Sequence, residues 1–166
     1  MLPLAAVSGC DGPDVLAAPP SPAADVTVLR EAIAAEQLMI TRYTTVLHHA
    51  GAAGAAGGSA GSLAGALEPL LAEHRAHLAQ LRSRLIVPAG SKARSATPHE
   101  RAPAAVPAGV SAGVAFLRTA EQDAATAMLK RLRAAPSSLA QLFASIGASE
   151  ATHVPVLNAA AARVAR

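Results

Sequence analysis

Aromatic residues are scarce in this 166-residue chain, where they make up 2% of the sequence and include no tryptophan. A core without large rings must be filled by smaller aliphatic side chains. Hydrophobic residues reach 52%, and most of them are alanine and leucine. Both are strong helix formers, and clusters of the β-branched residues that favour strands are few. The composition therefore favours closely packed helices in one domain.

Cysteine, charge and long apolar runs are also limited. The chain has one cysteine, which excludes an internal disulfide, so packing must supply the stability. No apolar run approaches the roughly 18 residues that a membrane-spanning helix requires. The net charge is +3, but no arginine-rich cluster with interleaved aromatics marks a nucleic-acid site. We therefore expect no nucleic-acid partner.

The single cysteine, Cys10, ends the motif Val7-Ser8-Gly9-Cys10, which follows an apolar run and resembles a bacterial lipobox. Residues 1–24 then read as a truncated signal with this lipobox, followed by a Pro/Ala-rich tether. On this reading Cys10 is lipidated, and the chain is anchored to the cell membrane on its extracytoplasmic face. No basic residue precedes the apolar run, as a secretory signal requires. The alternative is a disordered N-terminus with one chance cysteine.

Residues 25–166 show the hydrophobic spacing of four helices, because apolar positions step alternately by four and three. The predicted helices run from Asp25, as N-cap, to just before Gly51; from about 62 to 85; from about 109 to 133; and from a capping box of Ser138 and Gln141 onward. The predicted inward positions are Leu29, Ile33, Glu36, Ile40, Tyr43 and Leu47; Leu63, Leu67, Leu70, His74, His77, Leu81 and Leu85; Val110, Val114, Leu117, Glu121, Ala124, Met128 and Leu132; and Leu139, Phe143, Ile146, Glu150, His153, Leu157 and Ala160.

The connections predict the topology. Short joins between the first and second helices, and between the third and fourth, indicate antiparallel neighbours. The join over 86–108 is long and holds four prolines. A segment of that length can return along the whole bundle, which would leave the second and third helices parallel. The sequence thus predicts an all-α four-helix bundle with one long crossover between helices 2 and 3.

Ionisable residues occupy inward positions in all four predicted helices, where aliphatic side chains would be expected. They are Glu36, His74, His77, Glu121, Glu150 and His153, with Glu73 close to the face of His77. Several carboxylates in one apolar interior cannot all stay ionised without compensation. Metal cations between them would supply it, and carboxylate and imidazole donors suit a dinuclear site. Shared protons or arginine partners are the alternative. Tyr43 is a candidate redox-active phenol near such a site, but because it is about two turns from Glu36 the sequence favours a plain core aromatic.

One glutamate from each of two helices, with Glu and His from the other two, resembles the ferritin-like superfamily of di-iron carboxylate proteins. The helix-four motif Glu150-x-x-His153 matches intact, and Glu36 and Glu121 match the single glutamates of helices one and three. Helix two departs from the pattern, since Ala76 stands three residues after Glu73. Glu73 and His77, four residues apart, still share a face, but their ligand geometry would have to differ. The alternatives are that His74 replaces one ligand or that the site is degraded. With the lipobox, the chain is most similar to poorly characterised ferritin-like lipoproteins of high-GC bacteria.

The resemblance implies a ferritin-like bundle with a di-iron or other dinuclear centre and redox chemistry toward oxygen or peroxide. The ligands would come from Glu36, Glu73, His74, His77, Glu121, Glu150 and His153. The competing interpretation is a non-enzymatic lipoprotein with a structural polar network and a surface that binds a partner in the cell envelope. A homodimer is compatible with both interpretations, and neither identifies a substrate.

Overall fold

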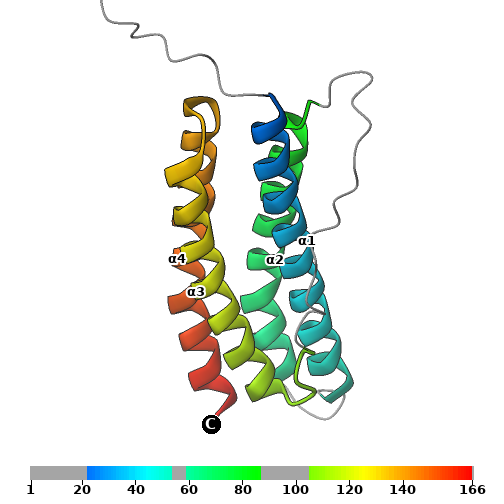
Figure 1. Cartoon of the computed structure of the whole chain (residues 1–166). Coiled ribbons are helices and arrows are strands. Elements are labelled where there is room, and N and C mark those ends of the chain that lie inside the picture. The colour runs from blue at the N-terminus through cyan, green and yellow to red at the C-terminus, as the bar shows by residue number, and fades with distance from the viewer. Residues whose placement is uncertain (1–21, 54–58, 87–104, 166) are drawn as a thin grey trace, which may run out of the picture.

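The computed structural model describes residues 22–53, 59–86 and 105–165, and this part of the chain contains four helices and no strand. The helices are α1 (Pro22–Ala53), α2 (Ser59–Arg84), α3 (Val110–Ala134) and α4 (Ser137–Val164). They form the predicted all-α four-helix bundle (Figure 1). Cys10, its motif and most of the predicted crossover lie outside the described residues. None of the described helices combines the length and the apolar character needed to cross a membrane.

The helices occupy the four corners of the bundle, with α1 and α4 each packed against both α2 and α3. The colour gradient of Figure 1 shows that α2 and α3 run in the same direction, opposite to α1 and α4. Two contacts place the start of α3 beside the end of α1: His49 Nδ1 lies 3.2 Å from the carbonyl oxygen of Pro107, and Gly113 adjoins Val46. Parallel α2 and α3 therefore occupy diagonal corners.

Several predicted helix boundaries are wrong by a few residues. Asp25 is not an N-cap, because α1 begins at Pro22 and Asp25 lies in its first turn. There its negative charge interacts favourably with the positive end of the helix dipole. The helix also continues past Gly51 to Ala53. The capping box of Ser138 does not form: α4 begins one residue earlier, at Ser137, with Pro136 as N-cap and no side-chain capping bond.

The inward faces of α2 and α4 agree with the prediction almost throughout. All seven predicted positions of α4 are buried, and so are the six predicted positions that lie in α2; the seventh, Leu85, directly follows the end of α2 and is partly buried. On α3, Val110, Ala124 and Leu132 are partly exposed at the edges of the predicted face.

The face of α1 is rotated from the predicted stripe. Its buried residues are Leu29, Ala32, Glu36, Met39, Tyr43, Val46 and Ala50, whereas Ile33, Ile40 and Leu47 are only partly buried and pack at the margins. The alanines lie inward because small side chains let neighbouring helices approach closely, and the larger isoleucines and leucine cover the sides of the contact.

Close helix approach is visible at Gly147 on α4. A Cβ atom built there would lie 3.2 Å from Cβ of Met128 on α3, tighter than ordinary van der Waals contact. The absence of a side chain at this position lets α3 and α4 pack face to face, and these two helices share the largest helix–helix contact in the bundle.

Two apolar clusters fill the described core. One includes Leu29, Ala32, Leu81, Met128, Leu139, Phe143 and Ile146; the other includes Met39, Tyr43, Val46, Leu63, Leu67, Leu70, Val114, Leu117 and Leu157. On α1 the first cluster ends at Ala32 and the second begins at Met39, so that Glu36 falls between them. On each of the other helices, too, the ionisable residues fall between the two clusters, although α2 and α3 meet the clusters in the opposite order along the chain. A layer of ionisable side chains therefore separates the two apolar clusters.

Candidate metal centre

The buried ionisable layer receives side chains from all four helices. Its six members are Glu36 from α1, His74 and His77 from α2, Glu121 from α3, and Glu150 and His153 from α4, and each is at most 8% exposed. These are the six inward ionisable positions that the sequence predicts. Because the apolar clusters close the layer on two sides, its charges have little water to solvate them, and their partners must come from one another or from bound ions.

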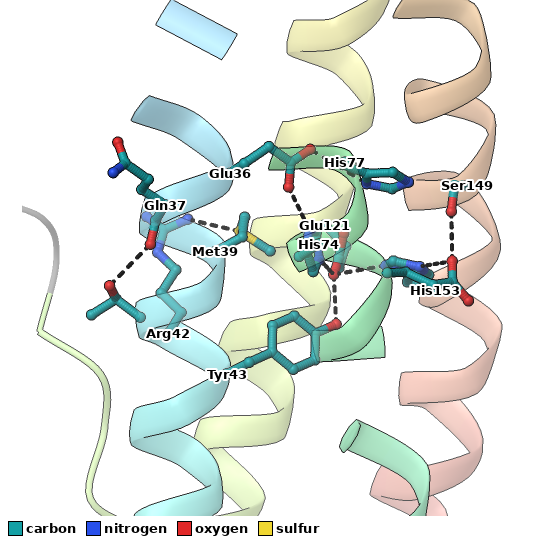
Figure 2. Close-up of polar contacts among 12 residues, drawn as sticks. Glu36, Gln37, Met39, Arg42, Tyr43, His74, His77, Glu121, Ser149 and His153 are labelled. Atoms are coloured by element: carbon teal, nitrogen blue, oxygen red, sulfur yellow. Dashed lines mark hydrogen bonds and ion pairs between the residues drawn. The ribbon is translucent and has the colours of Figure 1, made fainter. Parts of the chain in front are cut away.

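His74 occupies the middle of the layer, between α1 and α3 (Figure 2). Its Nδ1 lies 2.8 Å from Oε2 of Glu36, and its Nε2 lies 2.8 Å from Oε1 of Glu121. Carboxylates only accept hydrogen bonds, so an imidazole held between two of them donates from both nitrogens and is positively charged. Burial alone would lower the pKa of His74, but the hydrogen bonds to Glu121 and Glu36 raise it to about 9.

Oε1 of Glu121 accepts three hydrogen bonds, from the Tyr43 hydroxyl at 2.5 Å, His74 Nε2 at 2.8 Å and His153 Nδ1 at 3.0 Å. Burial would raise the pKa of Glu121, but the hydrogen bonds from His153 and His74 lower it to about 2. Tyr43 is a buried core aromatic, as predicted, but not a plain one, because its hydroxyl donates to the ionisable layer. Tyr43 is two turns from Glu36 along α1, but its hydrogen-bond partner, Glu121, comes from α3 across the bundle.

Glu73 lies at the rim of the layer, with 49% of its side chain exposed. It is the acceptor for the other nitrogen of His153: Glu73 Oε2 lies 3.0 Å from Nε2, and the Ser149 hydroxyl donates to the same oxygen at 2.6 Å. The hydrogen bonds from His153 and Ser149 lower the pKa of Glu73. His153 is thus held between two carboxylates: burial alone would lower its pKa, but the hydrogen bond to Glu121 and the negative charge of Glu121, together with the hydrogen bond to Glu73, raise it.

Register explains why α2 presents its histidines rather than Glu73. His74 and His77 are three residues apart and share the inward face, at 0% and 8% exposure, whereas Glu73 is turned about 100° from His74 around the helix. The inward pair of α2 therefore reads His74-x-x-His77, in register with Glu150-x-x-His153 of α4.

Four polar atoms of the layer have no hydrogen-bond partner within the described part of the chain: Oε1 of Glu36, Nδ1 of His77, Oε2 of Glu121 and Oε2 of Glu150. His77 Nδ1 and Glu36 Oε1 are 3.4 Å apart, within ion-pair distance but not aligned for a hydrogen bond. Buried polar atoms are normally paired, so a concentration of exceptions in one layer requires an explanation.

Glu150 forms no hydrogen bond in the described structure, although only 2% of its surface is exposed. Burial raises its pKa, and the negative charges of Glu36 and Glu121 raise it further, to about 8. The carboxyl group therefore stays protonated near neutral pH, unless a cation is close enough to stabilise the ionised form.

Five of the six buried residues supply donor atoms to two groups of three, and Glu150 belongs to neither group. One contains Glu36, His74 and His77, and the other contains His74, Glu121 and His153, with the atoms of each group within 4.8 Å of one another. His74 belongs to both groups. Carboxylate oxygen and imidazole nitrogen are donors for iron and other borderline divalent ions.

A pocket of about 170 Å³ lies between α1 and α3 and is lined in part by the buried Glu150. Much of its wall is small, with Ala35 on α1 facing Ala124 and Ala127 on α3. Arg42 and Arg131 also line it. The sequence prediction missed this pocket, and the run of alanines on the facing edges of α1 and α3 is the only sequence signal for it.

The fold and the layer together define a four-helix bundle with a buried carboxylate–histidine cluster. Comparison with known proteins adds no relative: no family model, no curated protein and no solved structure matches the chain.

Proposed function

We propose that this chain is a ferritin-like protein that binds two metal ions, iron in the first instance, in the buried layer and carries out redox chemistry with oxygen or peroxide. One observation carries the proposal: all four helices direct donors into a single buried layer, where the donors form two groups of three. A single acid–histidine pair would be adequately explained as a structural contact. Six such residues from four helices exceed what packing requires.

The residues fit such ions. Three carboxylate oxygens and one imidazole nitrogen without hydrogen-bond partners, on Glu36, Glu121, Glu150 and His77, are all lone-pair donors when deprotonated. The donor set of three carboxylates and three imidazoles matches the mixed oxygen and nitrogen preference of iron. When bound, a pair of iron ions would supply the electrons for the reaction with oxygen or peroxide.

The chain's own residues would hold and orient the donors. Glu36 and His77 would bind one ion, and Glu121 and His153 the other. Glu73 would fix the His153 ring through the hydrogen bond at Nε2, in the way carboxylates orient metal-binding histidines. Tyr43 would orient Glu121 through its hydroxyl. Glu150 would supply a further carboxylate from α4, and the pocket between α1 and α3 would give small molecules a route to it.

The ferritin-like part of the proposal is supported by topology. Parallel α2 and α3 at diagonal corners are what a long crossover between them would produce, although residues 87–104 lie outside the described structure. The His74-x-x-His77 pair stands where helix four has Glu150-x-x-His153.

We also propose that Cys10 is lipidated and that the bundle is tethered to the extracytoplasmic face of the membrane. The support is the Val7-Ser8-Gly9-Cys10 motif and the proline-rich stretch after it. Mass spectrometry of protein from its native host tests this. An acylated Cys10 at the mature N-terminus is expected, and an unmodified chain that keeps the residues before Cys10 would contradict it.

A structural polar network is the second candidate, because protons alone can balance part of the layer. His74 and His153 each contact two carboxylates through both ring nitrogens, and the resulting imidazolium charges offset those of Glu36 and Glu121. This arrangement leaves Glu150 and His77 without hydrogen-bond partners. It would suit a bundle whose surface binds another protein.

Metal analysis separates the two candidates. The protein, purified without an affinity tag, is loaded with Fe²⁺ under anaerobic conditions and freed of excess ion. We expect close to two irons per chain, followed by oxidation on exposure to oxygen or peroxide faster than that of the same iron in buffer. A His153→Ala variant should lose about one of the two irons and most of the oxidation, and an exposed control, His48→Ala, should lose neither. Iron content indistinguishable from buffer would favour the structural network.

A further inference from the structure

The central imidazole, His74, is the one donor shared by both groups. Its Nδ1 is directed toward Glu36, beside His77, and its Nε2 is directed toward Glu121, beside His153 (Figure 2). Each of these glutamates is also close to a second histidine: His77 Nδ1 lies 3.4 Å from Glu36 Oε1, and His153 Nδ1 lies 3.0 Å from Glu121 Oε1. The layer is therefore arranged as two Glu/His pairs on opposite sides of one ring.

The two nitrogens of an imidazole point away from each other, so a single ion cannot bind both. Each hydrogen bond from His74 now places a proton between a ring nitrogen and a carboxylate oxygen, at a separation of 2.8 Å. A cation that replaces such a proton would bind the nitrogen lone pair and the carboxylate together. Replacement on both sides would leave the ring as the connection between two ions.

We propose that His74 is an imidazolate bridge between the two metal ions, one bound also by Glu36 and His77 and the other by Glu121 and His153. The proposal rests on the dinuclear site proposed above and specifies how its two ions are joined. Two ring protons leave to solvent as two cations bind, and the ring then carries one negative charge. That charge lies between the cations and offsets part of their mutual repulsion.

The register of the chain supports this assignment. His74 lies three residues before His77 on α2, and Glu150 lies three residues before His153 on α4, so His74 occupies on α2 the position that Glu150 occupies on α4. It is completely buried, and none of its hydrogen bonds is to a group outside the two Glu/His pairs. Three imidazoles in the donor set favour borderline divalent ions such as Fe²⁺, Cu²⁺ and Zn²⁺ over Mg²⁺ or Ca²⁺.

Copper is the most direct probe, because two Cu²⁺ ions joined by an imidazolate couple magnetically. The full chain without a tag is titrated with Cu²⁺, and native mass spectrometry and electron paramagnetic resonance are recorded at each step. Two ions per chain with loss of the isolated-copper signal at the second equivalent would support the bridge. Two ions with additive, uncoupled signals would overturn the bridge while leaving the dinuclear site standing. No bound copper would remove both.

Variants then identify the bridging group. His74→Gln should abolish the coupling and weaken both ions by at least tenfold, whereas His77→Gln should weaken one ion and leave the other within a fewfold of wild type. Coupling that persists in a folded His74→Gln protein would assign the bridge to a carboxylate and overturn the proposal. Circular dichroism in chelator establishes whether each variant folds.

A second measurement needs no variant. In the Zn²⁺-loaded protein labelled with ¹⁵N-histidine, both ring nitrogens of His74 should lack an attached proton and show shifts displaced from those in chelator. A proton retained on either nitrogen after two equivalents of Zn²⁺ would overturn the bridge, even if His74→Gln fails to fold.

Discussion

The two sides of His74 differ in how well their groups are satisfied by the chain alone. On the α3 side, Glu121 accepts three hydrogen bonds through one oxygen, and His153 is held at both nitrogens. On the α1 side, Glu36 has one hydrogen bond, from His74, and His77 Nδ1 has none. The same residue types thus form an ordered half and an under-satisfied half of one layer.

This difference indicates different roles for the two halves. Hydrogen bonds that hold Glu121 and His153 in place contribute to folding without any ion, and on the proposed function they would also preorganise donors for metal binding. The unpaired atoms of Glu36 and His77 contribute little to folding and are available to a cation. We therefore expect the α3 half to dominate stability in chelator, and the α1 half to gain most from metal.

The largest expected effect is at Glu121. Glu121→Ala would remove the acceptor of the Tyr43 hydroxyl, of His74 Nε2 and of His153 Nδ1 in a buried layer, and we expect a loss of about 3–5 kcal/mol in the free energy of unfolding. Glu36→Ala removes one such bond and should cost about 1–3 kcal/mol. Urea unfolding in chelator measures both, with the exposed Gln122→Ala on the same helix as the control. Equal losses for the two glutamates would contradict the comparison.

The next effect is a change in pH dependence at Glu150. Its pKa is about 8 in the folded chain and near 4.5 when unfolded, so the folded state keeps a proton that the unfolded state has lost. Stability from this group is therefore complete below about pH 4.5 and falls as the pH rises toward 8, by up to about 1.4 kcal/mol per pH unit.

Glu150→Gln removes this titration. In chelator, we expect the free energy of unfolding of the variant to fall less steeply than that of wild type between pH 5 and pH 8. His74, with a pKa raised to about 9, loses its contribution between about pH 6.5 and 9 in both proteins, so the difference between the two curves isolates Glu150. Parallel curves would show that Glu150 ionises as it does in the unfolded chain.

The smallest expected effect is at the half-exposed Glu73. Glu73→Ala should cost no more than about 1 kcal/mol in chelator, because water can replace its hydrogen bond to His153. It should still weaken one of two bound ions by roughly 10- to 100-fold, since the His153 ring loses its orienting carboxylate. Competition titration with Zn²⁺ measures this, with Glu68→Ala on the same helix as control. Equal weakening of both ions would contradict the division into halves.

The sequence predicts the ionisable layer well, because its residues interrupt regular apolar stripes. In α4, Glu150 and His153 fall between Ile146 and Leu157 at the same spacing as the buried aliphatic residues. In α1 the stripe was misplaced because inward alanines such as Ala32 and Ala50 carry little hydrophobic signal, while partly buried isoleucines carry a strong one.

Contacts between helices are the part that spacing cannot supply. The hydrogen bond from Tyr43 to Glu121 joins residues 78 positions apart, and the bond from His153 to Glu73 joins residues 80 apart. Such pairs depend on the height at which two helices meet and on their rotation about their axes. Helix periodicity places a residue on a face, but it does not say which atom lies opposite.

The most direct test of the central claim, that the layer holds metal ions, is a set of thermal melts of wild type and Glu150→Ala, each with Fe²⁺ under anaerobic conditions and with chelator. We expect iron to raise the melting temperature of wild type, because binding to the folded state stabilises it, and to raise that of the variant much less. In chelator the variant should be as stable as wild type or more so, since it lacks a buried carboxyl group with no partner. A wild type unaffected by iron, with a variant destabilised equally in both conditions, would contradict the account.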